Sequence, residues 1–374
     1  MDFIKKERIY IWMLIFILGI SLLNIGHSRK KELADKRSIS SMTFQDMGVT
    51  EEKIKLFFES EKPGAVLFKY GLFAGVFMLL AGVAMNLFFL LGKKKMEPTR
   101  AKARGSLGGI LSGHYLSAAL RPRFCGRECI IPEKVPDKIS VSWGIADVLR
   151  AVIIVVFSGY MLGALTSAAS KLFHFNIDPN LGMILGTFFI DVIAGIVIFY
   201  FVLVKYREKL SRLGIASAGF YKNVLSGITA YVFILPILIS VLILSMLFLN
   251  SIGYKFQAQP VFDMFLEEKR SNVILFLTIF VSILGPIIEE IFFRGFLYSA
   301  VRKRFGVLSG VLLSAALFSM LHTNIAGFAP IMILGILMAF LYETTGSLIA
   351  PMAVHILHNS IIVGFVFFIK ELIR

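Results

Sequence analysis

The sequence carries little charge for its length. Only 17% of its 374 residues are Asp, Glu, Lys or Arg, whereas 57% are hydrophobic and the mean hydropathy is +0.80. A soluble domain averages about 25% charged residues, so the composition excludes an ordinary water-soluble fold. The apolar residues form continuous runs without strict alternation, which argues against a membrane β-barrel and predicts helices that span the bilayer.

Cysteine is nearly absent, since Cys125 and Cys129 are the only two. Two thiols supply at most half of a zinc site. A disulfide is also unfavourable, because we expect the loop that contains both cysteines to face the reducing cytoplasm. The metalloprotease motif His-Glu-x-x-His is also missing. We therefore predict no metal and no cofactor.

Acidic residues are outnumbered, with 24 Asp and Glu against 39 Lys and Arg. No basic segment is interleaved with aromatic residues, so we expect no nucleic-acid partner. The basic residues lie at the ends of apolar runs, where they indicate topology and contact with lipid headgroups. Residues 93–140 hold eleven Lys or Arg against four Asp or Glu, which predicts a cytoplasmic loop.

The apolar runs predict an all-α integral membrane protein with about eight or nine transmembrane helices. They lie near residues 9–26, 65–92, 146–169, 182–204, 223–249, 271–303, 307–322, 328–343 and 348–369. The first run follows Lys5, Lys6 and Arg8 and lacks a small-x-small cleavage site, so we expect an uncleaved anchor with a cytoplasmic N-terminus. We expect a multi-pass protein of a bacterial-type cell membrane. Asp147 is expected at the membrane interface, whereas Asp191 lies deeper and has no evident partner.

Between the first two apolar runs, Thr50 is a plausible N-cap for a short amphipathic helix reaching Glu59. Later in the chain, Gly285-Pro286 interrupts a long apolar run, and proline disrupts the helical hydrogen-bond ladder. We expect a kink or a new helix start there.

Two adjacent carboxylates, Glu289 and Glu290, lie just after this point in an apolar run. Glu290 is four residues before Arg294, so a helix pairs their side chains on one face. Glu289 points about 100° away and stays free. An ionisable residue inside a membrane is a functional-site hypothesis by default, because an ionised carboxylate there costs several kcal/mol.

Three further polar side chains fall within the hydrocarbon depth of about 30 Å, if each helix is measured from its basic end. These are His322, which follows Phe318 by four residues, and His355 and Asn359, which share a helix face. His358 is close enough to join them as a secondary member. A carboxylate can deprotonate water, a histidine can orient it, and His with Asn can stabilise an oxyanion.

The ordered set Glu-Glu-x-x-x-Arg, Phe-x-x-x-His and His-x-x-x-Asn resembles the three motifs of the CPBP family. That family contains type II CAAX prenyl proteases and bacteriocin-processing or immunity (Abi) proteins. The resemblance covers about residues 270–367 and implies an intramembrane glutamic endopeptidase. It implies that Glu289 is the general base, that His322 helps to activate the water, and that His355 and Asn359 form the oxyanion site. Glu290, Arg294 and Phe318 would then support the site.

We accordingly predict three parts: an anchor region over residues 1–140, membrane helices over 141–269, and a CAAX-protease-like core over 270–367. The expected partners are the lipid bilayer and a membrane-associated protein or peptide, which the resemblance allows to be lipidated. Three alternatives remain open. They are a non-catalytic scaffold or immunity protein of the same fold, a metal-dependent membrane protease using Glu289 with the histidines, and a transporter, for which the sequence shows no inverted repeat.

Overall fold

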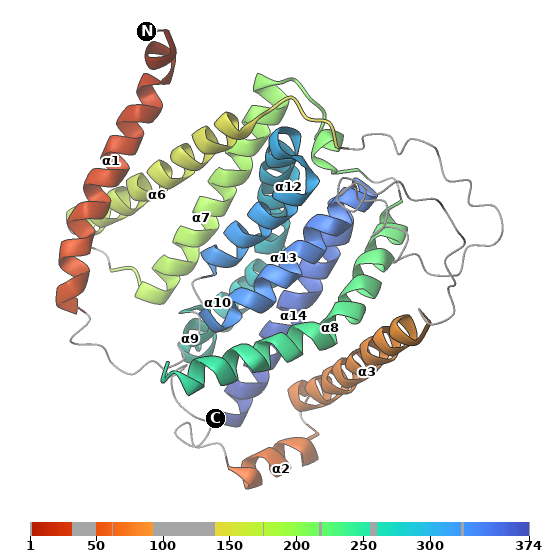
Figure 1. Ribbon diagram of the computed structural model, residues 1–374. Coiled ribbons are helices and arrows are strands. Elements are labelled where there is room, and N and C mark those ends of the chain that lie inside the picture. The colour runs from red at the N-terminus through yellow and green to blue at the C-terminus, as the bar shows by residue number, and fades with distance from the viewer. Residues whose placement is uncertain are drawn as a thin grey trace, which may run out of the picture.

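The computed structural model describes residues 2–31, 50–61, 63–92, 139–174, 176–216, 219–254, 260–322 and 325–373. All regular elements within these ranges are helices, as Figure 1 shows. Their bounds are α1 Asp2–Lys31, α2 Glu51–Glu59, α3 Pro63–Gly92, α6 Ile145–Phe173, α7 Pro179–Phe199, η4 Tyr200–Lys205, η5 Leu210–Leu213, α8 Phe220–Ser251, α9 Pro260–Glu267, α10 Ser271–Ile279, η6 Phe280–Leu284, α11 Gly285–Glu290, η7 Ile291–Tyr298, α12 Ser299–Leu321, α13 Ile325–Thr345 and α14 Ile349–Ile373. The predicted all-α class is confirmed.

Seven helical stretches within the described ranges are long and apolar enough to cross a membrane. They are Pro63–Leu91, Ile145–Phe173, Pro179–Lys205, Phe220–Ser251, Ser271–Leu321, Ile325–Thr345 and Ile349–Ile373. The fifth has 51 residues and turns at Gly306, whose φ of 85° is not helical. Because Gly310 lies against the ring of Tyr298, the chain folds back after this turn. The stretch therefore provides two spans, in agreement with the predicted polytopic bundle.

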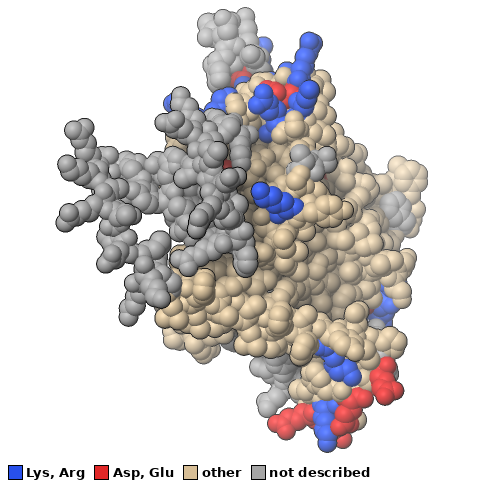
Figure 2. Space-filling model, turned by 90° about the vertical axis from the view of Figure 1, so that its right-hand side faces the viewer, with Lys and Arg blue, Asp and Glu red and all other residues tan. Residues whose placement is uncertain are grey.

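The surface of the bundle matches this arrangement. Figure 2 shows a broad band without charged side chains, and most of the charged side chains of this face gather at its two ends. Many large apolar side chains on the spanning helices are exposed, including Leu67, Phe77 and Leu244. Hydrocarbon solvates such side chains as well as a protein core does, so their exposure is expected of lipid-facing helices.

An ion cluster joins several helices at what we call the basic end of the bundle. Arg150 on α6 pairs with Glu7 on α1, and its Nη1 lies 3.0 Å from Oδ1 of Asp147. Lys205, the last residue of η4, pairs with the same aspartate. Asp147 is only 5% exposed, so it is a buried member of this cluster at the end of the bundle. The cluster places the starts of α1 and α6 at the same end as the close of η4, as the charge pattern predicts.

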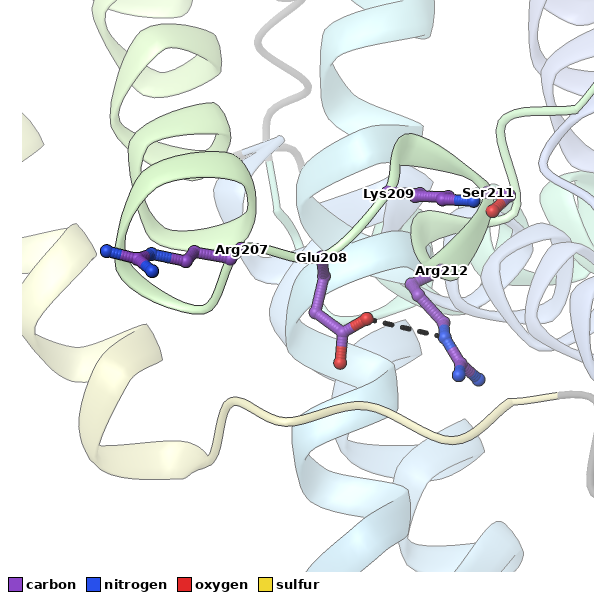
Figure 3. A pocket seen from close by; sticks show the side chains of 5 residues that line it. All are labelled: Arg207, Glu208, Lys209, Ser211 and Arg212. Atoms are coloured by element: carbon purple, nitrogen blue, oxygen red, sulfur yellow. Dashed lines mark ion pairs between the residues drawn. The ribbon is translucent and has the colours of Figure 1, made fainter.

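A cavity of about 460 Å³ opens beside this cluster, in the turn between η4 and η5. Figure 3 shows the side chains that line it, which are Arg207, Glu208, Lys209, Ser211 and Arg212. Glu208 lies 3.4 Å from Arg212 and is the single acid among them. The cavity contains none of the predicted site residues.

The core of the bundle is built around η7. Trp143 is fully buried just before α6, and its Nε1 donates a hydrogen bond of 3.0 Å to the carbonyl of Phe296. The two rings stack with centroids 5.6 Å apart. This contact fixes η7, on which Arg294 is carried, against the helices that precede the C-terminal part.

The α-helical element α11 begins at Gly285, as predicted from the Gly285-Pro286 pair, but it continues the helix before it. Gly285 keeps helical angles (φ −56°, ψ −56°), and its N–H donates to the carbonyl of Phe280, five residues earlier. The wider turns of a π-helix, η6, therefore absorb the proline without a break in the helix. A second π-helix, η7, follows α11, so the short segment with Glu289 and Glu290 lies between two such turns.

The N-cap predicted for α2 is confirmed, because the Thr50 side chain accepts a hydrogen bond of 3.3 Å from Lys53 N. Phe57 on this helix packs against Phe368 near the end of α14, with centroids 5.1 Å apart. Cys125 and Cys129, with most of the loop that we expect in the cytoplasm, lie outside the described residues.

Candidate active site

The predicted pair of Glu290 and Arg294 forms the buried base of the site. Nη1 of Arg294 lies 2.6 Å from Oε1 of Glu290, and both side chains are 0% exposed. The guanidinium also lies 4.5 Å from the ring centroid of Phe318 and 3.4 Å from the carbonyl of Gly335. A buried charge persists only when it is paired and hydrogen-bonded, and this arrangement provides both conditions.

His355 lies between the two adjacent carboxylates. Its Nδ1 is 2.9 Å from Oε1 of Glu290, and its Nε2 is 3.8 Å from Oε2 of Glu289. An ionised carboxylate can only accept hydrogen bonds, so beside Glu290 the proton belongs on Nδ1. The second nitrogen then faces Glu289 at a distance too long for a direct hydrogen bond. Glu290 thus fixes the orientation of both Arg294 and His355.

Glu289 is the accessible member of the group. Its side chain is 33% exposed, whereas His355 is 1% exposed. Its Oε2 atom is buried and has no hydrogen-bond partner among the described residues. Oε1 of the same carboxylate lies next to Gly285, where a Cβ would be in ordinary contact with it at 3.9 Å. A carboxylate oxygen without a partner beside an imidazole nitrogen can accept a proton from a small molecule bound between them.

Phe318 connects the two histidine-bearing helices. Its ring makes edge contacts with His322 at 4.7 Å and with His355 at 5.3 Å between centroids. Nδ1 of His322 lies 2.9 Å from the backbone carbonyl of Phe318. A carbonyl only accepts, so this contact places the proton of His322 on Nδ1 and leaves Nε2 as an acceptor in the neutral ring.

Asn359 binds the backbone next to the proline. Its Nδ2 donates a hydrogen bond of 2.9 Å to the carbonyl of Val281. In a π-helix this carbonyl would accept from residue 286, five positions later, but Pro286 has no N–H. Asn359 replaces the missing donor and ties α14 to η6. One N–H of the amide is used in this way, which leaves the second N–H for another acceptor.

His358 has a partner that the sequence did not reveal. Its Nδ1 lies 3.1 Å from the hydroxyl oxygen of Tyr231 on α8, and Tyr231 is 1% exposed. Tyr231 lies 127 residues earlier in the chain, and a single tyrosine in an apolar run gives no local signal of such a contact. The pairing fixes His358 next to the His355 side of the site.

The arrangement of the His, Cys, Asp and Glu side chains bears on the metal-dependent alternative. Within the described residues no group of three or more His, Cys, Asp and Glu side chains is arranged to hold a metal ion. Nδ1 of His322 and Nδ1 of His355 are engaged by a carbonyl and a carboxylate, respectively. The arrangement of these side chains suits hydrogen bonding and proton transfer.

The part of the chain that carries the site is similar to known proteins. Residues 271–361 match the family model described as "Type II CAAX prenyl endopeptidase Rce1-like". The match covers the part of the chain whose motifs resemble the CPBP family, and it supports that prediction. The chain is also 30% identical over 82 residues to the "Putative membrane peptidase YdiL" of Bacillus subtilis (strain 168). That alignment covers 22% of this chain and 34% of the relative, so the chain spans about a third of the relative's length. No solved structure matches the chain.

Proposed function

We propose that the protein is an intramembrane endopeptidase in which Glu289 activates a water molecule. One observation carries this proposal: the buried Oε2 atom of Glu289, without a partner among the described residues, faces Nε2 of His355 at 3.8 Å. A water bound between these two atoms would sit within reach of a base and an orienting group. The match to a CAAX prenyl endopeptidase model supports the same chemistry.

In the proposed reaction Glu289 takes a proton from water as the oxygen attacks a peptide carbonyl. The negative charge that develops on the carbonyl oxygen needs donors that are already in place. His355, which Glu290 holds through Nδ1, supplies one donor from Nε2 when that nitrogen carries a proton. The free N–H of Asn359 supplies a second, and His322 orients the water from the other side.

The proposed substrate is a membrane-associated protein or peptide with a lipidated, CAAX-like end. This proposal rests on the family description. It agrees with the depth of the site, because Glu289 precedes Arg302 at the basic end by thirteen residues, or about 20 Å of helix. A lipid-anchored segment can reach this depth from within the bilayer.

The test is cleavage of a quenched fluorescent peptide with a farnesylated cysteine, by the purified protein in liposomes. Glu289→Gln keeps the shape and hydrogen bonding of the side chain but cannot accept a proton. We expect it to abolish turnover and to leave the melting temperature nearly unchanged. Glu267→Gln, the same substitution at an exposed carboxylate on α9, is the matched control and should retain full activity.

The outcomes separate the competing functions. Full activity in Glu289→Gln would end the proposal of a glutamic protease. A protein that cleaves no membrane peptide in either form, yet folds normally, would be explained by the non-catalytic scaffold or immunity function. Such a scaffold needs only the Glu290–Arg294 pair to hold its helices together. The carboxylate of Glu289 would then have no role in it.

A further inference from the structure

A carboxylate outside the matched domain lies on the face of α7 that packs against the continuous helix formed by α10, η6 and α11. Ile184 and Phe188 mark this face: Ile184 is 2% exposed, and the Phe188 ring contacts Phe276 and Phe280 at 5.4 and 5.7 Å between centroids. Asp191 follows Phe188 by three residues and Ile184 by seven, so all three side chains share one stripe of the helix. Asp191 therefore faces the helix that carries Glu289.

The two carboxylates also lie at the same depth. Asp191 precedes Lys205, at the basic end, by fourteen residues, or about 21 Å, and Glu289 precedes Arg302 by thirteen, or about 20 Å. α7 packs directly against α11, so the charge of Glu289 acts on Asp191 across this helix contact. Asp191 has no hydrogen bond or ion pair with any described residue.

The surrounding groups decide which carboxyl group holds a proton. Glu289 lies near the positive charge of Arg294 and 3.8 Å from Nε2 of His355. No cation is within pairing distance of Asp191 among the described residues: α6 presents Gly159 at this level, and η6 presents the Phe280 ring. The other titratable groups of the site, Glu290, His322 and His358, have the partners already described.

Two ionised carboxylates close together in a medium of low dielectric constant would repel each other strongly, so the pair retains one proton. We propose that Asp191 and Glu289 form an acid–base pair that holds one proton between them, with Asp191 the protonated member and Glu289 the ionised member. The pair would separate the roles of acid and base between two unequal environments. The catalytic part of this inference rests on the proposed function.

In that reaction Glu289 takes one proton from water, and the water oxygen forms a bond to the peptide carbonyl carbon. The bond between this carbon and nitrogen then breaks, and the leaving nitrogen takes the proton of Asp191. The proton held by Glu289 passes to the Asp191 carboxylate and restores the starting state. Water is consumed, and a carboxylic acid and an amine are formed.

The first experiment needs no substrate. Infrared spectra of the full-length protein in a maltoside detergent, which has no ester carbonyl, report the C=O stretch of protonated carboxyl groups. We expect a deuterium-sensitive band at neutral pH that is lost in Asp191→Asn. As the pH is raised, the band should disappear at a lower pH in Glu289→Gln than in the wild type. Asp178→Asn, at the exposed N-cap of the same helix, should leave the band unchanged. If the band is absent in the wild type, or is unchanged in Asp191→Asn, the proposal that Asp191 and Glu289 share one proton is refuted.

The second experiment compares the farnesylated peptide with an analogue whose scissile amide is an ester, because an alcohol leaves with less need of a proton than an amine. We expect Asp191→Asn to lower kcat on the amide at least 100-fold, a magnitude typical of general acid catalysis, and on the ester less than tenfold. Asp191→Glu should recover part of the loss. An equal loss of kcat on both substrates would show that Asp191 has a structural role and is not the general acid. If no variant or wild-type protein cleaves either substrate, the proposed function fails while the infrared result still decides the pair.

Discussion

Glu290 should hold the site together, so removing its charge should destabilise the protein. In Glu290→Gln the carboxylate that binds Nη1 of Arg294 at 2.6 Å and Nδ1 of His355 at 2.9 Å becomes a neutral amide. Arg294 then stays buried, at 0% exposure, without its nearest counter-charge. Removing one member of a buried ion pair costs about 3–5 kcal/mol. Because Glu289 is still close enough to interact with Arg294, we expect the lower part of this range.

The measurement is a thermal melt in detergent of the wild type and Glu290→Gln. For a chain of 374 residues, a loss of about 3 kcal/mol corresponds to roughly 4 °C in Tm. The matched control is Glu59→Gln on α2, where Glu59 faces Lys55 with the same spacing of four residues at 3.9 Å, at 62% and 77% exposure. An exposed pair contributes less than about 1 kcal/mol, so the control should melt like the wild type.

A second variant separates the unpaired charge from other effects of the substitution. Glu290→Gln combined with Arg294→Met removes both charges and leaves no buried cation, so we expect it to regain part of the lost stability. If Glu290→Gln melts no lower than Glu59→Gln, the pair does not support the site. If instead Glu290→Gln abolishes turnover while Glu289→Gln alone lowers the Tm, the roles of the two carboxylates are the reverse of our assignment.

Three other predictions test topology, metal dependence and pH dependence. The loop over residues 93–138 should be cytoplasmic, so a membrane-impermeant thiol reagent should label Cys125 in lysed cells and spare it in intact ones; labelling in intact cells would reverse the topology. Hydrolysis should proceed without metal, and activity that is lost to a chelator and restored by stoichiometric zinc would contradict this. The Arg270 side chain, with hydrogen bonds from backbone N–H groups, lowers the pKa of Glu268 to about 2. The ionised Glu268 therefore stabilises the fold above its unfolded-state pKa of about 4.3, and this stabilisation is lost as the pH falls through 2. Glu268→Gln should weaken the decrease of Tm at acid pH, and an unchanged decrease would show that the pairing is unimportant.

Much of the local structure follows from the sequence. Apolar runs locate the spanning helices because about 20 residues cross the hydrocarbon. Spacing of four residues pairs Glu290 with Arg294 because a helix turns every 3.6 residues. The Gly285-Pro286 pair correctly marks the start of α11, but no local pattern predicts the π-helix before it or the hydrogen bond by which Asn359 replaces the donor that proline lacks.

The motifs identified which residues to watch, but only the tertiary structure decided how they meet. It placed His355 between Glu289 and Glu290, His358 against Tyr231, and the stripe with Asp191 against the helix that carries Glu289. The physical reason lies in the composition of the spanning helices. They are apolar on almost every side, because lipid and core are both apolar, so the sequence has no alternation of polar and apolar faces from which to tell which side of each helix turns inward.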